Sequence, residues 1–459
     1  MTMYAYAPDE LAQITKGKWH GSRAGQPLTK FCFDARQIEV GDCFVALSGG
    51  VRDGHDFVEQ AAIGGASAVM VERIVDISLP QLVVDDSLCA LGLIGASARA
   101  RFDGPVVGIT GSCGKTSTKE MLRRLLGVEQ THATKGNLNN RIGVPLTLID
   151  LDPATAKSAV VEAGINQPGE MQLLGEMIRA DLTIITNIGA AHLELLGSLD
   201  GIAVEKARLF QEARPDSHVV FSSELLKYPV FSTVADRAIV LHRSGEPMPD
   251  IEVGKWVQYE LYPIDGKGPG YELLIGSAKY VVHTSSLGIA TNTALGIAAA
   301  YELGVDCVEL QERIAEWRPA LNRGHTLQKD GQFFYVDCYN ANPTSMADAL
   351  DAFDAVAGTQ PRAYVLGAMN ELGASAVELH ESVGKQLKLR PQDQAIFIGP
   401  QALSGAYQKG ALEAGNLASQ LNVCETLENV KSEIAQFQGA LFLKGSRSYQ
   451  LEKLLSNAT

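Results

Sequence analysis

Short, unbroken apolar runs recur along the chain, separated by longer stretches in which apolar residues have helical spacing. Such runs are typical of strands buried on both faces of a parallel sheet. The predicted strands are 42–47, 68–71, 81–84, 106–109, 158–161, 182–185, 218–221, 333–336, 363–366, 395–398 and 440–443. A helix is predicted at 57–62, between the first two strands. The alternation of strand and helix predicts an α/β fold.

The pattern changes between about 238 and 285. Residues 253–259 and 271–275 alternate apolar and polar positions and are joined by Gly and Pro turns, which favours antiparallel strands added to the same domain. Further helices are predicted at 291–303, 308–317, 343–355, 375–388, 401–413, 426–436 and 447–455. The last third therefore repeats strand–helix units.

Two short stretches divide the chain. Residues 101–105 have the composition of a linker, and Pro319 marks a second boundary. At ~100–200 residues per domain, 459 residues correspond to about three domains. We predict a small α/β domain at 1–101, a central domain with a mostly parallel sheet at 102–318, and a Rossmann-like α/β domain at 319–459.

The central domain begins with a candidate phosphate-binding loop. A buried strand runs into a turn with Gly111 and Gly114, after which Lys115 and Thr116 open a helix that Gly127 ends. Glycines let backbone N–H groups approach phosphates, the helix N-terminus adds partial positive charge, and the Lys and Thr suit terminal phosphates and magnesium. The residues predicted to bind ATP here are Thr110, Gly111, Ser112, Cys113, Gly114, Lys115, Thr116 and Ser117.

The glycine spacing of this loop differs from that of the usual P-loop. Gly108 lies one residue too early to be the first glycine, so the match is to the shorter form Gly-x-x-Gly-Lys-Thr. The alternative is an ordinary strand–turn–helix with a capping glycine, which would require strand, glycines, Lys-Thr and helix to coincide by chance. Cys113 within the loop is either a small filling side chain or a reactive thiol.

Polar residues follow the strands of the central domain. In open parallel sheets ligands bind at the carboxyl ends of strands. Glu162 directly follows such a strand and is placed to hold magnesium, although a capping or surface acid is the alternative. His192 is either a second metal ligand or a loop histidine, and spacing alone predicts that Lys206 is a solvent-facing helix lysine.

Two further candidates lie at the start of the third domain. Asp337 comes directly after a strand, where a carboxylate can accept hydrogen bonds from a ribose or position a metal-linked water. Arg323 lies beside the predicted hinge at 318–320, and an arginine from another domain is a common way to neutralise phosphate charge. A turn residue and a surface charge are the alternatives. In the first domain the glycine loop 49–56 is either an anion site or a solvated turn.

Composition limits the class of protein. The net charge is −14 with no run of Lys and Arg, which argues against a nucleic-acid partner. The first ten residues lack a basic start and a long apolar core, so we expect no secretory signal, and no stretch approaches the ~20 apolar residues of a membrane span. The seven scattered cysteines indicate free thiols in a reducing cytoplasm.

These motifs together resemble the ATP-dependent Mur ligases of peptidoglycan synthesis, over nearly the whole chain. The loop matches the family's form Thr-Gly-x-x-Gly-Lys-Thr, and 134–145 is similar to the segment that faces the substrates. Tyr339-Asn340-Ala341-Asn342-Pro343 and Lys444-Gly445-Ser446-Arg447 look like the branch that adds a dipeptide, and an Asp-Asn-Pro-Arg signature of the branch that adds the third residue is absent from the sequence.

The resemblance implies roles for individual residues. Thr116, Glu162 and His192 would bind magnesium, with two ions in all, and Lys206 would be a carbamoylated lysine that is a further ligand, in contrast to the prediction from spacing. The catalytic residues would be Lys115, His192 and Lys206. Asn292, Arg323 and Asp337 would contact ATP. The implied substrate residues are Asp34, Arg36, Gly54, His55, Asn137, Asn139, Asn140, Tyr339, Asn340 and Asn342.

The resemblance also implies the reaction. ATP would phosphorylate UDP-N-acetylmuramoyl-tripeptide, held by the first domain, and D-alanyl-D-alanine would attack the acyl phosphate, with the third domain closed over the nucleotide. We expect a monomeric cytoplasmic ligase. One alternative is a folylpolyglutamate-type ligase, which shares the loop but normally lacks a domain before it. A nucleotide-gated binding protein is the other.

Overall fold

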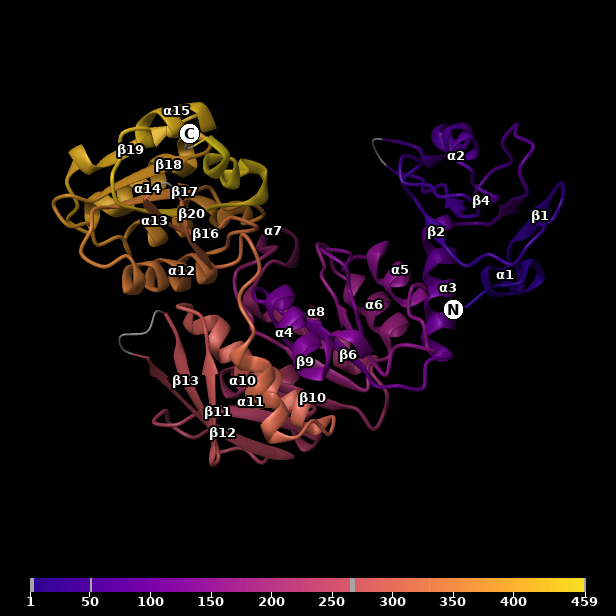
Figure 1. The fold of residues 1–459 in the computed structure, drawn as a ribbon, viewed down its shortest axis with the longest axis horizontal. Helices are drawn as coiled ribbons and strands as arrows, with labels where there is room; N and C mark the ends of the chain where they lie inside the picture. Colours follow the sequence, from indigo (N-terminus) through magenta and orange to yellow (C-terminus); the bar gives the residue numbers. More distant parts are fainter. Residues whose placement is uncertain (1–3, 50–51, 265–268, 330, 458–459) are drawn as a thin grey trace.

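Three separate sheets organise the molecule, each with its own helices (Figure 1). The computed structural model describes residues 4–49, 52–264, 269–329 and 331–457. Positions 50 and 51 of the predicted glycine loop, and the first three residues of the N-terminal stretch, lie outside this part. The predicted α/β fold class is confirmed. In the described residues no helix combines the length and the apolar character needed to cross a bilayer.

The first sheet has five strands in the order β1-β5-β4-β3-β2. Strands β2 to β5 are parallel and β1 is antiparallel to β5. The elements are α1 (Pro8–Thr15), β1 (Lys18–His20), β2 (Phe31–Cys32), β3 (Cys43–Val45), α2 (Val58–Ile63), β4 (Ala68–Val71), β5 (Gln81–Val83) and α3 (Ser87–Ala100). The predicted strands 42–47, 68–71 and 81–84 match β3, β4 and β5, whereas the short β1 and β2 were not predicted.

The central sheet has nine strands in the order β14-β13-β12-β11-β10-β9-β6-β8-β7. Its strands are β6 (Val106–Thr110), β7 (Thr131–Ala133), β8 (Ser158–Glu162), β9 (Leu182–Ile185), β10 (His218–Ser222), β11 (Ala238–Arg243), β12 (Lys255–Pro263), β13 (Tyr271–Ile275) and β14 (Ala278–Val282). The predicted antiparallel region is β12 to β14, but β12 also pairs in parallel with β11, so the sheet is continuous.

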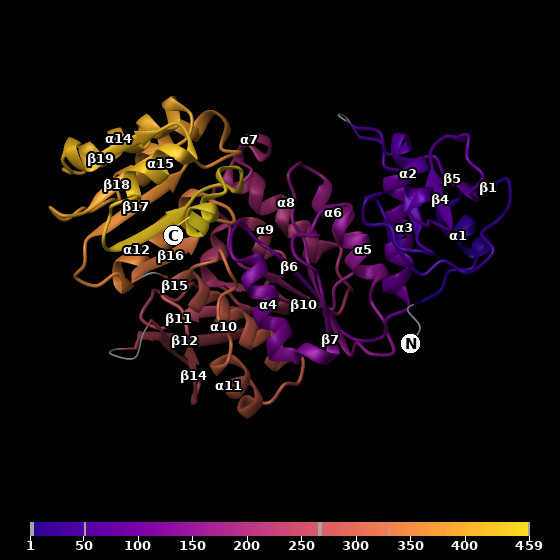
Figure 2. The ribbon, with the colours of Figure 1, turned by 45° about the horizontal axis from the view of Figure 1, so that its top comes forward.

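Helices cover both faces of this central sheet (Figure 2). They are α4 (Lys115–Leu126), α5 (Gly143–Ile149), α6 (Glu170–Ile178), α7 (Leu193–Leu196), α8 (Leu199–Gln211), α9 (Pro229–Ser232), α10 (Leu287–Glu302) and α11 (Cys307–Ala315). Because β6 lies between β8 and β9, the residues after all three strands meet at one edge of the sheet. The phosphate loop follows β6 and therefore lies at that edge.

The third sheet has six strands in the order β15-β16-β20-β17-β18-β19, parallel except for β15. The elements are β15 (His325–Lys329), β16 (Gln332–Asp337), α12 (Pro343–Val356), β17 (Arg362–Gly367), α13 (Ala376–Gly384), β18 (Gln394–Ile398), α14 (Gln401–Glu413), β19 (Leu421–Cys424), α15 (Leu427–Ile434) and β20 (Ala440–Lys444). The helix predicted at 447–455 is instead two 3-10 segments, because Gln450 between them has a left-handed backbone (φ 49°).

One buried arginine joins the first domain to the central sheet. The guanidinium of Arg99, at the end of α3, donates to the carbonyls of Ile178, Phe102 and Arg179 and pairs with Asp181 at 2.8 Å. Its side chain is only 2% exposed, so every contact replaces water. The linker after α3 is thereby held against the start of β9.

Close helix packing in the third domain gives a stability prediction. A Cβ built on Gly410 would lie 2.0 Å from the carbonyl oxygen of Glu381, whereas one on Gly405 in the same helix meets nothing within 4 Å. We expect Gly410→Ala to lower the stability of this domain by about 1–3 kcal/mol or more through overpacking. Gly405→Ala should raise it by about 0.5–1 kcal/mol, because alanine favours helix. Calorimetric unfolding distinguishes the two variants. Equal unfolding transitions for both would contradict the close packing at Gly410.

Candidate active site

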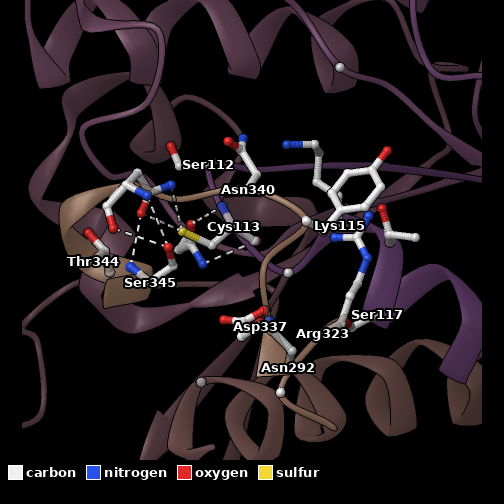
Figure 3. Close-up of a pocket in the computed structure, with 18 of the residues that line it drawn as sticks. Ser112, Cys113, Lys115, Ser117, Asn292, Arg323, Asp337, Asn340, Thr344 and Ser345 are labelled. Carbon is white, nitrogen blue, oxygen red and sulfur yellow. Dashed lines mark hydrogen bonds between the residues drawn. The ribbon is translucent and has the colours of Figure 1, made fainter. Parts of the chain in front are cut away.

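A cavity of about 390 Å³ lies between the phosphate loop and the third domain. Loop residues 112–117 of the central domain line it together with Arg323, Asp337 and Asn340 of the third (Figure 3). Of the predicted site residues, those lining the cavity are Ser112, Cys113, Gly114, Lys115, Thr116, Ser117, Asn137, Asn139, Asn140, Glu162, His192, Asn292, Arg323, Asp337, Tyr339, Asn340 and Asn342. The fold thus gathers residues more than two hundred positions apart.

Two glycines of the loop are required by contact as well as by backbone angle. Gly111 has φ +152°, and a Cβ there would lie 1.9 Å from the Thr186 hydroxyl oxygen. Gly114 has φ +78°, and a Cβ there would lie 2.2 Å from the side-chain nitrogen of Asn292. No side chain fits at either position, so the loop backbone touches the residues after β9 and the helix α10 directly.

Residues after β9 also hydrogen bond to the loop. The backbone N–H of Cys113 donates to Asn187 Oδ1 at 2.9 Å, and the Thr186 hydroxyl donates to the Cys113 carbonyl at 2.6 Å. Ser112 Oγ lies 2.9 Å from both the carbonyl and the N–H of Gly189. These bonds fix the loop before any ligand arrives, which lowers the entropic cost of binding a phosphate.

Lys115, Thr116 and Glu162 lie together at the start of α4. Lys115 Nζ donates to the carbonyl of Gly111 at 2.8 Å, and Thr116 Oγ1 donates to Glu162 Oε1 at 3.1 Å. Asn139 Nδ2 donates to the same carboxylate oxygen at 2.7 Å. Burial lowers the pKa of Lys115, and the negative charge of Glu162 opposes that shift. The second oxygen of Glu162, Oε2, is buried with no hydrogen-bond partner in the described structure.

The structure contradicts the prediction from spacing that Lys206 faces solvent. Its side chain is fully buried on α8, and its Nζ has no hydrogen-bond partner in the part of the chain described. Burial holds the pKa of this amine well below its usual range, and the charge of Lys115 lowers it further. Lys206 thus lies near the phosphate loop as a buried amine whose neutral form is favoured by its surroundings.

His192 points toward the third domain. It caps α7 with a left-handed backbone, and its Nδ1 lies 2.6 Å from the carboxylate of Glu371. This partner lowers the pKa of Glu371. Across the described ranges no three His, Cys, Asp or Glu side chains cluster to hold a metal ion. A magnesium ion here would therefore need oxygen ligands from outside this residue set.

The third domain contributes an ordered cation and a paired carboxylate. The guanidinium of Arg323 stacks 3.7 Å from the ring centre of Tyr339. Lys444, only 1% exposed, pairs with the Asp337 carboxylate and donates to the carbonyl of Asn340 at 3.2 Å. The polar turn after β16 is thus held from the end of β20, its parallel neighbour.

Cys113 contacts the third domain directly. Its thiol lies 3.2 Å from Oδ1 and 3.1 Å from Nδ2 of Asn342, which caps α12 (Figure 3). Burial raises the pKa of the Cys113 thiol. The raised pKa favours the thiol form, and the half-buried side chain of Cys113 is a contact between the two domains.

The first-domain candidates do not line this cavity. Asp34 is paired with Arg36 through two hydrogen bonds of 2.9 and 2.7 Å, which lower the pKa of Asp34 to about 2. The ring of His55 is buried, with Nδ1 on Asp53 and Nε2 accepting from the N–H of Glu72. Both ring nitrogens of His55 are therefore engaged within the protein, and its role toward a substrate stays a prediction. The first sheet lies on the opposite side of the central domain from the third (Figure 1).

Gly54 has a packing requirement of its own. A Cβ there would lie 2.5 Å from the backbone nitrogen of Leu47, so glycine is needed for this close approach. Thr110 and Gly111 lie at the end of β6, just behind the cavity wall.

Known proteins match this chain across its central and third domains. The middle domain of Mur ligases matches residues 109–237, and the Mur ligase glutamate ligase domain matches 322–447. The UDP-N-acetylmuramoyl-tripeptide–D-alanyl-D-alanine ligase of Escherichia coli is 31% identical, over 99% of this chain and 98% of that protein. The chain belongs to the Mur ligase family.

Solved structures agree with this assignment. A crystal structure of MurF from Acinetobacter baumannii is 28% identical, with a TM-score of 0.85 over 100% of this chain and 99% of that one. A MurF ligase from Thermotoga maritima, in complex with ADP, is 24% identical with a TM-score of 0.78, over 94% and 96% of the two chains. The latter similarity shows the shared fold.

Several residues of this Mur ligase's cavity were not predicted. Among them are Asn166, Ser286, Gly288, Thr344, Ser345, Asp348 and Lys444. Lys444 begins the motif Lys444-Gly445-Ser446-Arg447 directly after a predicted strand, and that position could have indicated a site residue. Ser286 and Asp348 meet only through the tertiary fold.

Breaking the Lys444 pair gives a second prediction. Lys444→Met leaves the Asp337 carboxylate and the Asn340 carbonyl without their cation, so the third domain should lose about 3–5 kcal/mol of stability. Calorimetry measures the loss. Lys388→Met, at an exposed position of the same domain, is the control. A Lys444→Met protein as stable as that control would contradict the assigned role of the pair.

Proposed function

We propose that this chain is an ATP-dependent ligase that joins D-alanyl-D-alanine to UDP-N-acetylmuramoyl-tripeptide, giving the pentapeptide, ADP and phosphate, as a monomer in the cytoplasm. The observation that carries the proposal is the shared cavity, in which a phosphate loop faces a cation and a carboxylate from another domain. The relative from Escherichia coli is named for this reaction.

The loop and the third domain have separate tasks in the proposed reaction. The tripeptide carboxylate attacks the terminal phosphorus of ATP, and the resulting acyl phosphate is attacked by the free amine of D-alanyl-D-alanine, with phosphate leaving. Lys115 and Arg323 approach from opposite domains and spread the charge of the transferred phosphoryl group. Asn292 and Asp337 hold the nucleotide. The contact between Cys113 and Asn342 helps exclude water from the reactive acyl phosphate.

The amide-rich part of the cavity suits a peptide substrate. Asn137, Asn139 and Asn140 from the central domain face Tyr339, Asn340 and Asn342 from the third. Asn140 Oδ1 is used by the N–H groups of Ile142 and Gly143, at 3.1 and 2.9 Å. Amides can both donate to and accept from a peptide backbone, so we place the acceptor dipeptide and the tripeptide end here. The first domain, with Asp34 and Arg36, would hold the UDP-sugar.

The residues at the phosphate loop fit a magnesium ion that is bound partly by the phosphates of ATP. Thr116 and Glu162 are oxygen donors at the loop, and Glu162 Oε2 lacks a partner among the described residues. Magnesium is commonly held by one or two carboxylates plus substrate phosphates, which agrees with the absence of a larger cluster in the described part. When bound, magnesium neutralises phosphate charge. His192 would join it only after leaving Glu371.

Lys206 fits carbamoylation. Carbon dioxide adds to the neutral form of an amine, which burial favours at Lys206, and the carbamate product is an anionic oxygen donor for which the Nζ has no competing hydrogen-bond partner among the described residues. That anion would offset the charge of Lys115 and offer a ligand oxygen beside the loop.

The decisive experiment measures phosphate release. We expect release from ATP only when UDP-N-acetylmuramoyl-tripeptide and D-alanyl-D-alanine are both present. Lys115→Ala should abolish it without unfolding, because the terminal phosphates lose their cation, and Lys157→Ala, at an exposed turn, should not. Release independent of the amine would instead support a nucleotide-gated binding protein.

A separate experiment tests Lys206. Lys206→Ala should lose activity because the anionic ligand is absent, and added short carboxylates should restore part of it. Lys115→Ala is the matched control, since a lost cation cannot be replaced by an anion. Full activity of Lys206→Ala would remove this lysine from the site.

A further inference from the structure

The first turn of α10 is capped by a carboxylate from the third domain. Asp348 lies on α12, on the side of the third sheet that faces the central domain (Figure 1). Its Oδ1 accepts from the N–H of Gly288 at 2.8 Å, and its Oδ2 accepts from the Ser286 hydroxyl at 2.6 Å. Ser286 Oγ in turn accepts from the N–H of Ile289 at 2.9 Å. A negative charge at a helix N-terminus is favourable.

This contact is closely fitted. A Cβ built on Gly288 would lie 3.3 Å from the carboxylate carbon of Asp348, so the helix approaches Asp348 with little space to spare. Ser286 is only 2% exposed, which removes water as an alternative partner. Burial raises the pKa of Asp348, and its bonds to Ser286 and Gly288 oppose that shift. Breaking the pair would therefore leave polar groups poorly solvated.

The same helix touches the phosphate loop one turn later. Asn292 of α10 lies against Gly114, where a Cβ would come within 2.2 Å of its side-chain nitrogen. Asp348 also lines the cavity, as do Asn292 and Asp337. A single rigid helix therefore connects the docked third domain to the loop.

We propose that Asp348 is a positioning residue for the nucleotide, because its carboxylate docks α12 on the first turn of α10. Asn292 and the phosphate loop belong to the central domain, and Asp337 and Arg323 belong to the third. Docking sets the distance between these two groups. This proposal rests on the proposed function, because it takes ATP as the ligand. Asp348 acts through Ser286 and Gly288 and takes no part in the chemistry.

The test measures the affinity of a non-hydrolysable ATP analogue with magnesium by calorimetry, on the full chain. Asp348→Ala should weaken binding by about ten- to a hundredfold, the range for losing hydrogen bonds to a charged group. Ser286→Ala should weaken it in the same direction. The double variant should lose less than the product of the two, because both remove one contact. Multiplicative losses would contradict the proposed contact.

Two variants separate positioning from folding. Asp348→Asn should bind the analogue within about threefold of the parent, since its amide oxygen still accepts from Gly288 and its nitrogen can donate to Ser286. Asp351→Ala, at an exposed position of the same helix, should leave affinity unchanged. Affinity for UDP, which the first domain would hold away from this cavity, should be unchanged in Asp348→Ala. An equal loss for both ligands would indicate a general structural effect and overturn the proposal.

The outcomes also separate this inference from the proposed function. A parent protein that does not bind the analogue contradicts ATP use itself. A parent that binds it while Asp348→Ala binds equally well contradicts only the docking role.

Discussion

The backbone of the phosphate loop lies in direct contact with two other elements, and much of the site depends on this. Gly111 meets Thr186 after β9, and Gly114 meets Asn292 on α10. Neither glycine can carry a side chain, so the distance from the loop backbone to Thr186 and to Asn292 is fixed. Lys115 and Thr116 inherit their positions from that arrangement, because they begin the helix that follows the loop.

Contacts across the domain junction complete the cavity. Cys113 meets Asn342, His192 meets Glu371, and Asp348 meets Ser286. Each pairs one residue from the central domain with one from the third. The polar turn after β16 is itself held by Lys444, so the third domain presents a preformed face.

The sequence predicts many of the buried parallel strands from their apolar runs, and it misses strands that are short or partly exposed. It also misses β11, which has five buried residues and lies in the region where the pattern changes. β15 has only intermediate and exposed side chains, and β2 has two residues, so neither leaves a clear pattern. The boundaries of the three domains stay a prediction. The phosphate loop was predictable because its chemistry is local. The docking of Asp348 was not, because its partners are about sixty positions away in another domain.

Lys206 shows how an available signal was missed. Ile202, Ala203, Ala207 and Phe210 form the buried stripe of α8, and position 206 lies on that stripe by helical spacing. The prediction of a solvent-facing Lys206 did not weigh this buried stripe, which indicates burial. For His55 the sequence could not show that the fold engages both ring nitrogens, because Glu72 lies seventeen positions away.

The buried guanidinium of Arg99 has a consequence for engineering chimaeras. It belongs to α3, yet its partners are carbonyls and a carboxylate at the end of α6 and the start of β9. Gly95 of the same helix lies against Pro145 of α5, where a Cβ would come within 2.6 Å of the backbone. The first domain is therefore not an interchangeable module at residue 101. A graft from a relative must carry α3 together with the matching surfaces of α5 and α6.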